Sequence, residues 1–419
     1  MAVSFVYFFV VYCALAVGAQ SPSCPDTNPT SYCSCYPEGS GFWIECEGDY
    51  ATAEKMSEAL TFYQSYALIV RFDIIRIKQN VFNYVPDDFL VANQISSVSF
   101  QCNHYHNVND GLLMISVNAF KDSFGECGLT GNLTFRDCNL RQFDAAVLNN
   151  CHQLKHLAFV DSHVESLIDF PTLKNLQNFT VYSPRQWTAA PQRGLSRMAL
   201  APGASLPLLS YLDLTGNSLE DDSVKFVSQE ASMQEMHLEG NHFFSVPNLT
   251  NCLNLHTFST TLDISSSVSI QLPDPREQLQ PLEASFYSSS NTVHEVTSLR
   301  GMFGYDVLNL KLDMTRFDES VFLGPLLSSN LIINLNSDSK FLCGCNIAWL
   351  VRDNRQLLNR VRNGFCADGT AFESIPEQEL SGCLKDSRVR HRIDRSHKNN
   401  GSPGVMVSSR YGRNAGRQS

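Results

Sequence analysis

A regular spacing of apolar residues is the most informative pattern along this chain of 419 residues. Its best-kept copy consists of Leu209, Leu212, Leu214, Asn217 and Leu219. The alternation of apolar and polar positions around Leu212 predicts a short strand with one buried face, and Asn217 predicts a turn. The same frame returns 24 residues later, beginning at Met233. One such unit has too little apolar surface to fold alone, so we expect a stack of repeats.

This frame resembles the signature of leucine-rich repeat proteins. Eleven frames begin, in chain order, at Ala67, Ile95, Thr130, Leu154, Leu176, Leu209, Met233, Leu255, Leu279, Val307 and Asn330. The resemblance predicts an α/β solenoid over residues 61–340, a leucine-rich repeat horseshoe whose parallel sheet lines the concave face. The asparagine is expected to be buried, with its amide bonded to the backbone of the adjacent coil. Cys138 occupies that position in its repeat, which predicts a small buried side chain.

Cysteines gather in two segments that flank the repeats, residues 20–60 and residues 341–383. Both segments resemble the cysteine caps of extracellular leucine-rich repeat proteins, which shield the apolar ends of the array. The resemblance implies four disulfides, which are Cys24–Cys35, Cys33–Cys46, Cys343–Cys366 and Cys345–Cys383. Zinc ligation by the C-x-C pairs is the alternative, which an oxidising destination disfavours.

Five further cysteines lie between the caps: Cys102, Cys127, Cys138, Cys151 and Cys252. Cys127 and Cys151 fall at equivalent places in adjacent repeats, so a disulfide could join them. A bond between Cys102 and Cys127 is the rival pairing. With 13 cysteines after residue 19, at least one is left without a partner in the chain.

Residues 1–19 form an apolar stretch that predicts a signal peptide, with Val17 and Ala19 suited to cleavage before Gln20. An uncleaved anchor helix is the alternative, because the stretch has no Lys or Arg ahead of it. No later window predicts a membrane span, and the last residues do not resemble a lipid-anchor signal. We therefore expect a secreted, extracellular protein.

The formal net charge of −11 is unevenly distributed. Residues 384–419 hold nine Lys or Arg and two Asp, a balance of +7, which leaves −18 for the rest of the chain. An acidic body disfavours nucleic acid as the main partner. The basic tail is poor in apolar residues and is expected to be disordered. It either remains solvated or binds an acidic surface.

Acidic residues recur at outward positions of the predicted strands, together with a tyrosine and a histidine. The candidates for contact with a partner are Tyr211, Asp213, Glu235, His237, Glu239, Glu283 and Asp313. They form either an acidic binding strip on the concave face or a solvated surface. Trp187 lies in a long, arginine-containing insertion at 182–208, which is either a contact loop or a segment folded over the convex side.

Four sequons predict N-glycosylation at Asn132, Asn178, Asn248 and Asn400. Glycans on Asn132 and Asn178 would cover the early concave surface and leave the later repeats for a partner. The chain has no nucleophile elbow, HExxH, P-loop or dinucleotide motif, so we expect neither catalysis nor a cofactor. A metal site at His104 and His106, near Cys102, is the weak alternative.

The segments VFNYVPDDF, CGCNIAWLV and the closing CADGT carry a closer resemblance, which extends over residues 24–383. They are similar to arthropod secreted leucine-rich repeat proteins, a group that includes the non-catalytic subunit of oplophorus-luciferin 2-monooxygenase. This resemblance implies a secreted, non-catalytic protein that binds another extracellular protein, as a companion subunit of a secreted complex. The alternatives are recognition of microbial ligands, a shed receptor-like or adhesion ectodomain, and a subunit of a luciferase-type monooxygenase.

Overall fold

The computed structural model describes most of the chain between residues 22 and 383. The described ranges are 22–26, 30–49, 51–90, 95–103, 111–121, 127–182, 194–229, 231–263, 267–273, 282–288, 293–301 and 304–383. Trp187, Asn400, His104, His106, the expected signal peptide and the basic tail lie outside the described residues. Within the described ranges, no helix has the length and apolar content to cross a membrane.

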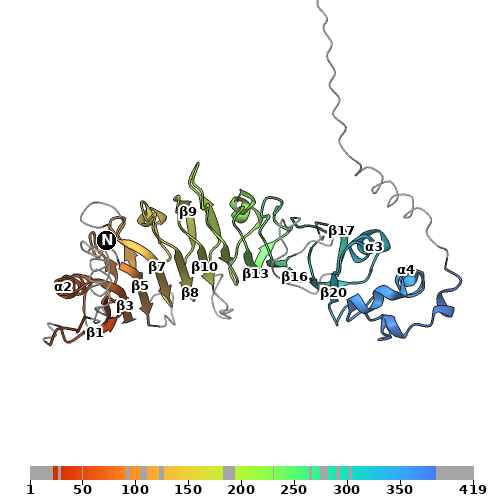
Figure 1. Cartoon of the computed structure of the whole chain (residues 1–419), viewed down its shortest axis with the longest axis horizontal. Helices are drawn as coiled ribbons and strands as arrows, with labels where there is room; N and C mark the ends of the chain where they lie inside the picture. Colours follow the sequence, from red (N-terminus) through yellow and green to blue (C-terminus); the bar gives the residue numbers. More distant parts are fainter. Residues whose placement is uncertain are drawn as a thin grey trace, which may run out of the picture.

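One sheet of 14 strands runs the length of the molecule (Figure 1). Its strands are, in spatial order, β1 Cys33–Glu38, β2 Gly41–Glu47, β3 Ile69–Ile77, β5 Ile95–Cys102, β7 Leu129–Arg136, β8 His156–Val160, β10 Asn178–Tyr182, β12 Tyr211–Asp213, β13 Glu235–Phe243, β14 Thr257–Leu262, β16 Glu283–Ser288, β18 Val307–Lys311, β20 Ile332–Leu335 and β21 Val361–Arg362. Only β1 is antiparallel to its neighbour, and the other neighbours pair in parallel. Parallel neighbours in unbroken chain order define a solenoid, because each coil adds one strand.

Between these strands the chain returns through short sheets and helices. The short strands are β4 Tyr84–Val85, β6 Met114–Ile115, β9 Ser166–Phe170, β11 Arg197–Leu200, β15 Ser267–Gln271, β17 Val293–Arg300 and β19 Asp313–Met314. The α-helices are α2 Ala53–Gln64, α3 Glu319–Ser328 and α4 Ala348–Val351. 3-10 helices complete the described returns, at η1 Ala145–Leu148, η2 Asp221–Gln229, η3 Cys345–Ile347, η4 Arg355–Arg360, η5 Phe372–Ser374 and η6 Glu377–Leu380.

The core lies between the main sheet and the returns, and aromatic rings stack along it. Phe100, Phe135 and Phe159 lie on successive strands and are fully buried. Their ring centroids are 5.0 Å and 5.3 Å apart, with the planes 13° from parallel in both pairs. The inward side chain of each coil therefore packs on its equivalent in the next, as stacked repeats require.

The asparagine positions form a buried ladder between coils, as the sequence predicts. Asn217 accepts a hydrogen bond from the Leu195 amide at 2.9 Å, and its Nδ2 donates to the Val181 carbonyl at 2.6 Å. Asn241 accepts from the Leu219 amide at 3.1 Å. These side chains are 4% and 1% exposed, so they satisfy backbone groups that water does not reach.

In four coils the residue before the ladder position adopts a left-handed backbone conformation. Gly216 and Gly240 have φ of 76° and 69°, and Asp137 and Asp161 have φ of 57° and 50° in earlier coils. Asp and Gly tolerate this region better than most residues. In these coils, the turn that ends the strand is therefore specified by two adjacent residues, the ladder residue and the one before it.

Three of the eleven predicted frames are displaced by two residues. The register equates Phe72, Ala284 and Leu308 with Leu212, whereas the frames from Ala67, Leu279 and Val307 place Val70, Leu282 and Leu310 there. A slip of two residues keeps the same side chains on the same face, so alternation alone does not detect it.

Six disulfides tie the described chain together, four of them in the caps. The cap pairs are Cys24–Cys35, Cys33–Cys46, Cys343–Cys366 and Cys345–Cys383, which are those that the resemblance implies. Inside the array, Cys127 bonds to Cys151. The rival pair of Cys102 with Cys127 is wrong, because Cys102 bonds to Cys138. Cys138 is buried, as expected, but it is a cross-link between coils rather than a free side chain. Cys252 is a buried thiol outside these six disulfides, and its Sγ lies 3.4 Å from the Val227 carbonyl oxygen.

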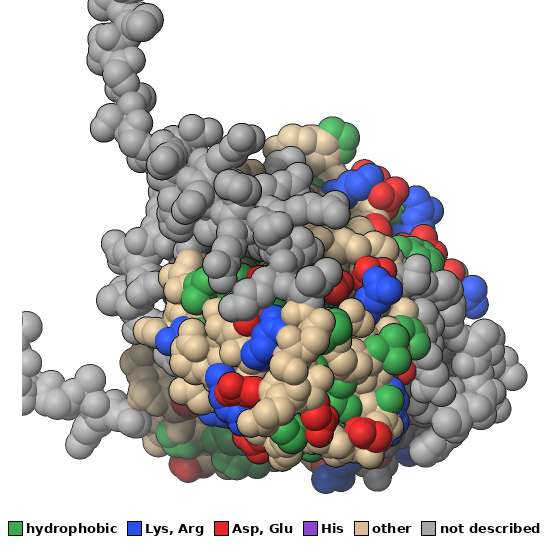
Figure 2. Space-filling view, turned by 90° about the vertical axis from the view of Figure 1, so that its right-hand side faces the viewer, with side chains coloured by type: hydrophobic (Ala, Val, Ile, Leu, Met, Phe, Trp, Pro, Cys, Tyr) green, Lys and Arg blue, Asp and Glu red, His purple; other side chains and the backbone are tan. Residues whose placement is uncertain are grey.

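The C-terminal cap closes the last coil around an aromatic cluster. Trp349 of α4 is 5% exposed, its Nε1 donates to the Phe317 carbonyl at 3.0 Å, and the two rings stack at 5.6 Å. Arg352 donates from Nη1 to the carbonyls of Leu380 and Cys383. Figure 2, which looks onto this end, shows charged and polar side chains interspersed with scattered apolar ones. The fold is a leucine-rich repeat solenoid with a disulfide-bonded cap at each end.

Candidate functional site

The outward side chains of β12 and β13 bring most of the partner-contact candidates together. Tyr211 pairs in register with Glu235, and Asp213 pairs with His237. Because side chains at every second residue of a strand share a face, these four and Glu239 lie on one surface. We call this surface the acidic strip, and it consists of Tyr211, Asp213, Glu235, His237 and Glu239, with Ser259 of β14 and Glu283 of β16.

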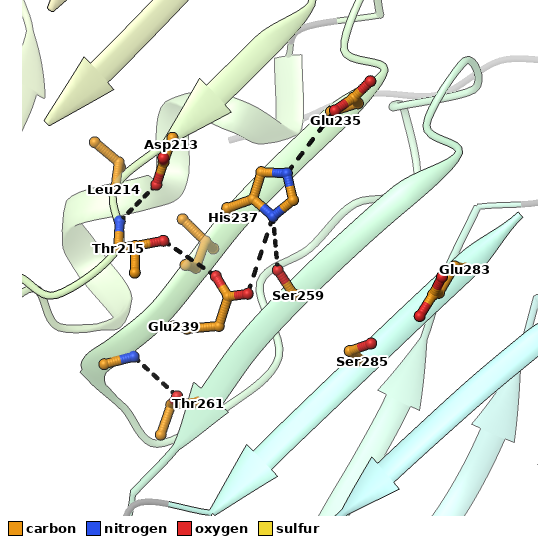
Figure 3. Close-up of polar contacts among 12 residues, drawn as sticks. Asp213, Leu214, Thr215, Glu235, His237, Glu239, Ser259, Thr261, Glu283 and Ser285 are labelled. Carbon is orange, nitrogen blue, oxygen red and sulfur yellow. Dashed lines mark hydrogen bonds and ion pairs between the residues drawn. The ribbon is translucent and has the colours of Figure 1, made fainter. Parts of the chain in front are cut away.

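His237 is the centre of the acidic strip (Figure 3). Its Nδ1 hydrogen-bonds the Ser259 hydroxyl at 3.0 Å and lies 3.9 Å from Oε1 of Glu239. Its Nε2 lies 3.9 Å from Oε2 of Glu235. The ring of Tyr211 packs against it, with the centroids 5.7 Å apart. Carboxylates on two sides and a hydroxyl on a third fix the imidazole in the middle of the surface.

The charges of the acidic strip shift one another. The Glu239 carboxylate beside Nδ1 raises the pKa of His237 above its usual value, against the opposing effect of partial burial. Burial acts to raise the pKa of Glu239, but hydrogen bonding to His237 and Ser259 outweighs it and lowers that pKa to about 2. Burial raises the pKa of Tyr211, and the nearby carboxylates add to this shift. Glu239 is therefore held as a carboxylate, while His237 takes up its proton at a higher pH than an ordinary histidine because its pKa is raised.

Side chains that the sequence analysis did not select complete the cluster. Thr215 donates from its hydroxyl to Oε2 of Glu239 at 3.2 Å, and Nε2 of His256 lies 4.0 Å from Oε1 of Glu235. Asn309 of β18 donates to the hydroxyl of Ser285 at 2.9 Å. Their outward positions in the repeats are the signal that could have found them.

Two expected members of the site lie away from its centre. Glu283 is on β16, so β14 separates it from Glu235, and it contacts Asn309 instead. The prediction that Asp313 faces outward from the main sheet is wrong, because Asp313 is not on that sheet. It lies in β19 of a separate three-stranded sheet, paired with Val293. The displaced Val307 frame caused this error, since the true frame places Asp313 at the ladder position after the strand.

Three of the four sequons lie in the described part of the chain, two on the strand face and one in a turn. Asn132 and Asn178 point outward from β7 and β10, in register with His156 between them. Asn132 is exposed and Asn178 is half-buried, on the same face as the acidic strip but earlier in the array. Asn248 is exposed in a turn after β13, where its Oδ1 accepts from the Thr250 hydroxyl.

The chemistry of the acidic strip is that of a binding surface. Among the described residues, no group of three or more His, Cys, Asp or Glu side chains is arranged to hold a metal ion. The strip carries four carboxylates, from Asp213, Glu235, Glu239 and Glu283, and carboxylate oxygens are acceptors of hydrogen bonds. Such a surface is complementary to a cationic partner.

No protein-family model matches the chain, and no curated protein matches it. A solved structure that resembles it is the crystal structure of a TLR13–ssRNA13 complex, with 12% sequence identity and a TM-score of 0.35. The similarity covers 80% of this chain and 60% of that chain, so this chain spans well under two thirds of its length. The class of protein, a capped leucine-rich repeat solenoid, follows from this chain's own strand register and asparagine ladder.

Proposed function

We propose that the chain is a secreted, non-catalytic leucine-rich repeat protein that binds another extracellular protein through the acidic strip. The observation that carries this proposal is the gathering of Asp213, Glu235, His237 and Glu239 on two adjacent strands. Four carboxylates of the strip meet no Lys or Arg on the strip itself, which favours a partner with a basic contact surface. The apolar N-terminal stretch and six disulfides support export to an oxidising compartment.

The resemblance to arthropod secreted leucine-rich repeat proteins supports the role of a companion subunit in a secreted complex. Glycosylation of the sequons and cleavage of residues 1–19 belong to the same proposal. Recognition of a microbial ligand, or the role of a shed receptor-like ectodomain, would use the same solenoid with a different surface. Participation in a luciferase-type complex would pair this chain with a separate catalytic subunit, as the resemblance implies.

The test is a comparison of charge-matched variants. The full chain is expressed as a secreted protein and used to capture partners from the extracellular fluid of its source, with bound proteins identified by mass spectrometry. The variant E235Q/E239Q removes two charges from the strip, and E58Q/E379Q removes two exposed charges from α2 and the C-terminal cap. A cooperative thermal unfolding transition shows that each variant is folded.

We expect one partner to bind the wild-type chain and the E58Q/E379Q control equally, and E235Q/E239Q about tenfold more weakly, equivalent to about 1.4 kcal/mol. Binding should weaken as salt concentration rises. Equal binding by both variants contradicts a role for the strip. Selective binding to microbial cell walls instead of a protein supports the recognition alternative, and light emission by this chain alone with a coelenterazine-type substrate contradicts the non-catalytic role.

A further inference from the structure

The strand face also contains a hollow at its N-terminal end, across β2, β3, β5 and β7. Its volume is about 710 Å³. This size falls within the range of about 300–1,000 Å³ that is usual for small-molecule sites. Ser97, Ser99 and Thr134 contribute short side chains where longer ones would fill the space. Ser99 is in register with Thr134 and Ser97 with Asn132, so the short side chains leave this part of the strand face hollow.

One wall of the hollow is a rigid polar cluster around Asp73. Its Oδ2 accepts from Nε1 of Trp43 at 3.0 Å and from Nε of Arg71 at 2.8 Å. The Arg71 guanidinium also lies 4.5 Å from the Trp43 ring centroid. The ring of Tyr36 packs on the same tryptophan, with the two ring centroids 4.7 Å apart. These contacts hold the three side chains in one geometry before any ligand arrives.

The other carboxylate oxygen of Asp73 is not satisfied. Asp73 is 5% exposed, and its buried Oδ1 has no hydrogen-bond partner among the residues that the structure describes. A buried acceptor without a partner costs free energy, so a small shift of the lining that brought Oδ1 to a donor on a ligand in the hollow would be stabilising. Hydroxyl and amide N–H groups are such donors.

The charge of the lining favours a neutral ligand. Arg71 and Arg136 oppose Glu38, Glu45 and Asp73, which leaves a formal charge of −1 from 2 − 3. Carboxylates, guanidinium groups, hydroxyls and the Asn132 amide together offer many donors and acceptors with little net field. A saccharide, with several hydroxyls and no charge, fits this composition better than an ion.

A source of saccharide is built into the same wall. Asn132 lines the hollow, is exposed, and begins the sequon Asn132-Leu133-Thr134. In N-glycosylation its Nδ2 bonds to the anomeric carbon of N-acetylglucosamine. The bond from that carbon to a lipid-linked diphosphate donor breaks, and the amide loses a proton. The first sugar would thus begin at the edge of the hollow.

We propose that this hollow is a saccharide subsite that holds the first sugars of the chain's own N-glycan on Asn132, with Asp73 as an acceptor for their N–H or O–H groups. The inference rests on the proposed export of the chain and is independent of the acidic strip. A glycan held there covers β2 to β7 of the strand face. A partner would then meet the face only at the later strands.

The test measures enzymatic glycan release from the folded secreted protein, followed at each site by glycopeptide mass spectrometry. Asn248 is the internal control, because it is exposed in a turn far along the array. We expect both sites to be occupied, with release from Asn132 at least tenfold slower than from Asn248, and equal rates after denaturation. An Asn248 glycan with an unmodified Asn132 overturns the inference and leaves export standing.

Two variants locate the protection. S97Y fills the hollow from a half-buried position on β5 and should expose the glycan, so that release at Asn132 accelerates at least fivefold. T134S keeps the sequon and should preserve the slow release. Equal release rates in wild-type protein, or slow release that S97Y does not change, overturn the proposal.

A last arm distinguishes the attached glycan from a free saccharide. The N132Q variant lacks the glycan, and its hollow is titrated with N,N′-diacetylchitobiose while backbone amide shifts are recorded. Binding by N132Q with no binding by the wild-type protein supports occupation by the attached sugars. Equal binding by both proteins shows a site for free saccharide and overturns the proposed occupant, as does no binding by N132Q.

Discussion

Asn217 and Asn241 donate from their side-chain amides to the same acceptor, the carbonyl oxygen of Leu214, and both distances are 2.8 Å. The two asparagines occupy equivalent places in consecutive coils. One backbone carbonyl therefore links two turns, and Asn241 also donates to the Leu238 carbonyl at 3.0 Å. The ladder is a continuous chain of bonds along the solenoid rather than a set of separate turns.

We predict that N241A lowers the free energy of unfolding by about 2–4 kcal/mol, because it leaves buried backbone groups of two coils without partners. The measurement is urea unfolding followed by circular dichroism. N254A is the control, since the exposed Asn254 makes one bond, to the Ala231 carbonyl, and its loss should cost about 0.5 kcal/mol or less. Equal losses in the two variants would show that burial of the ladder adds nothing.

The disulfide between Cys102 and Cys138 yields a second prediction. It joins the end of β5 to the turn after β7 and closes a loop of 36 residues. We expect the C102S/C138S variant to unfold about 2–4 kcal/mol more readily in the absence of reductant. Peptide mapping of the unreduced wild-type protein should recover the Cys102–Cys138 and Cys127–Cys151 pairs. A Cys102–Cys127 peptide would contradict the assigned bonds.

C252A provides the control for that experiment. Cys252 is a buried thiol outside the six disulfides, so its replacement by Ala removes the sulfur and its contact with the Val227 carbonyl without cutting a cross-link. Its cost should be small, about 1 kcal/mol. A cost for C252A equal to that of C102S/C138S would show that packing, not the cross-link, governs the difference.

The third prediction concerns pH. The Glu239 carboxylate raises the pKa of His237, with further support from Asp213 and Glu235 and opposition from burial. A histidine with a raised pKa in the folded state contributes stability that is complete below its unfolded value of about 6.5. That contribution is lost as the pH rises through the higher folded value. We expect the His237 resonance to titrate above 6.5 in an NMR pH series.

The E239Q variant tests the cause of this shift. Its His237 should titrate at a lower pH than in the wild-type protein, and its stability should change less between pH 6 and pH 8. H256Q is the matched control, because His256 approaches Glu235 rather than Glu239. The electrostatic assignment fails if E239Q leaves the titration of His237 unchanged. In the acid range, the Glu239 contribution is present above its usual pKa of 4.5 and lost as the pH falls toward about 2.

The fourth prediction concerns the C-terminal cap. W349A removes a ring that is stacked on Phe317 and its hydrogen bond to the Phe317 carbonyl. We expect a loss of about 3–5 kcal/mol and increased binding of a hydrophobic dye, because the last coils lose their cover. L342A, which alters a side chain that is 55% exposed, should have little effect on either readout. Unchanged dye binding by W349A would show that the cap does not protect the core from solvent.

The repeat pattern predicts the fold well because each coil repeats the same inward positions. The frame around Leu212 and its asparagine yields the parallel sheet, the ladder and the order of the strands. The pattern fails where the repeats lack the consensus residues, because the two-residue alternation near Val307 fits two registers equally well. The loss of Asp313 from the site follows directly from that ambiguity.

The contacts that join different strands of the site are less predictable, because their residues are over 20 positions apart. His237 and Ser259 meet only when β13 and β14 are in register, which the spacing of weak frames does not fix. The hollow around Asp73 is a clearer case. It includes Trp43, and treating the N-terminal cap as a separate unit hides the continuation of the strand face through β2.

The two ends of the long sheet determine how this molecule behaves at high concentration. A parallel sheet of 14 strands could add another copy at either end, as fibrils do, if its last strands offered free backbone groups. One end is β1, which turns back antiparallel and is cross-linked by Cys33–Cys46. The other is β21, a strand of two residues within the cap. A second copy that stacked on either end would therefore find no long parallel strand on which to continue the array.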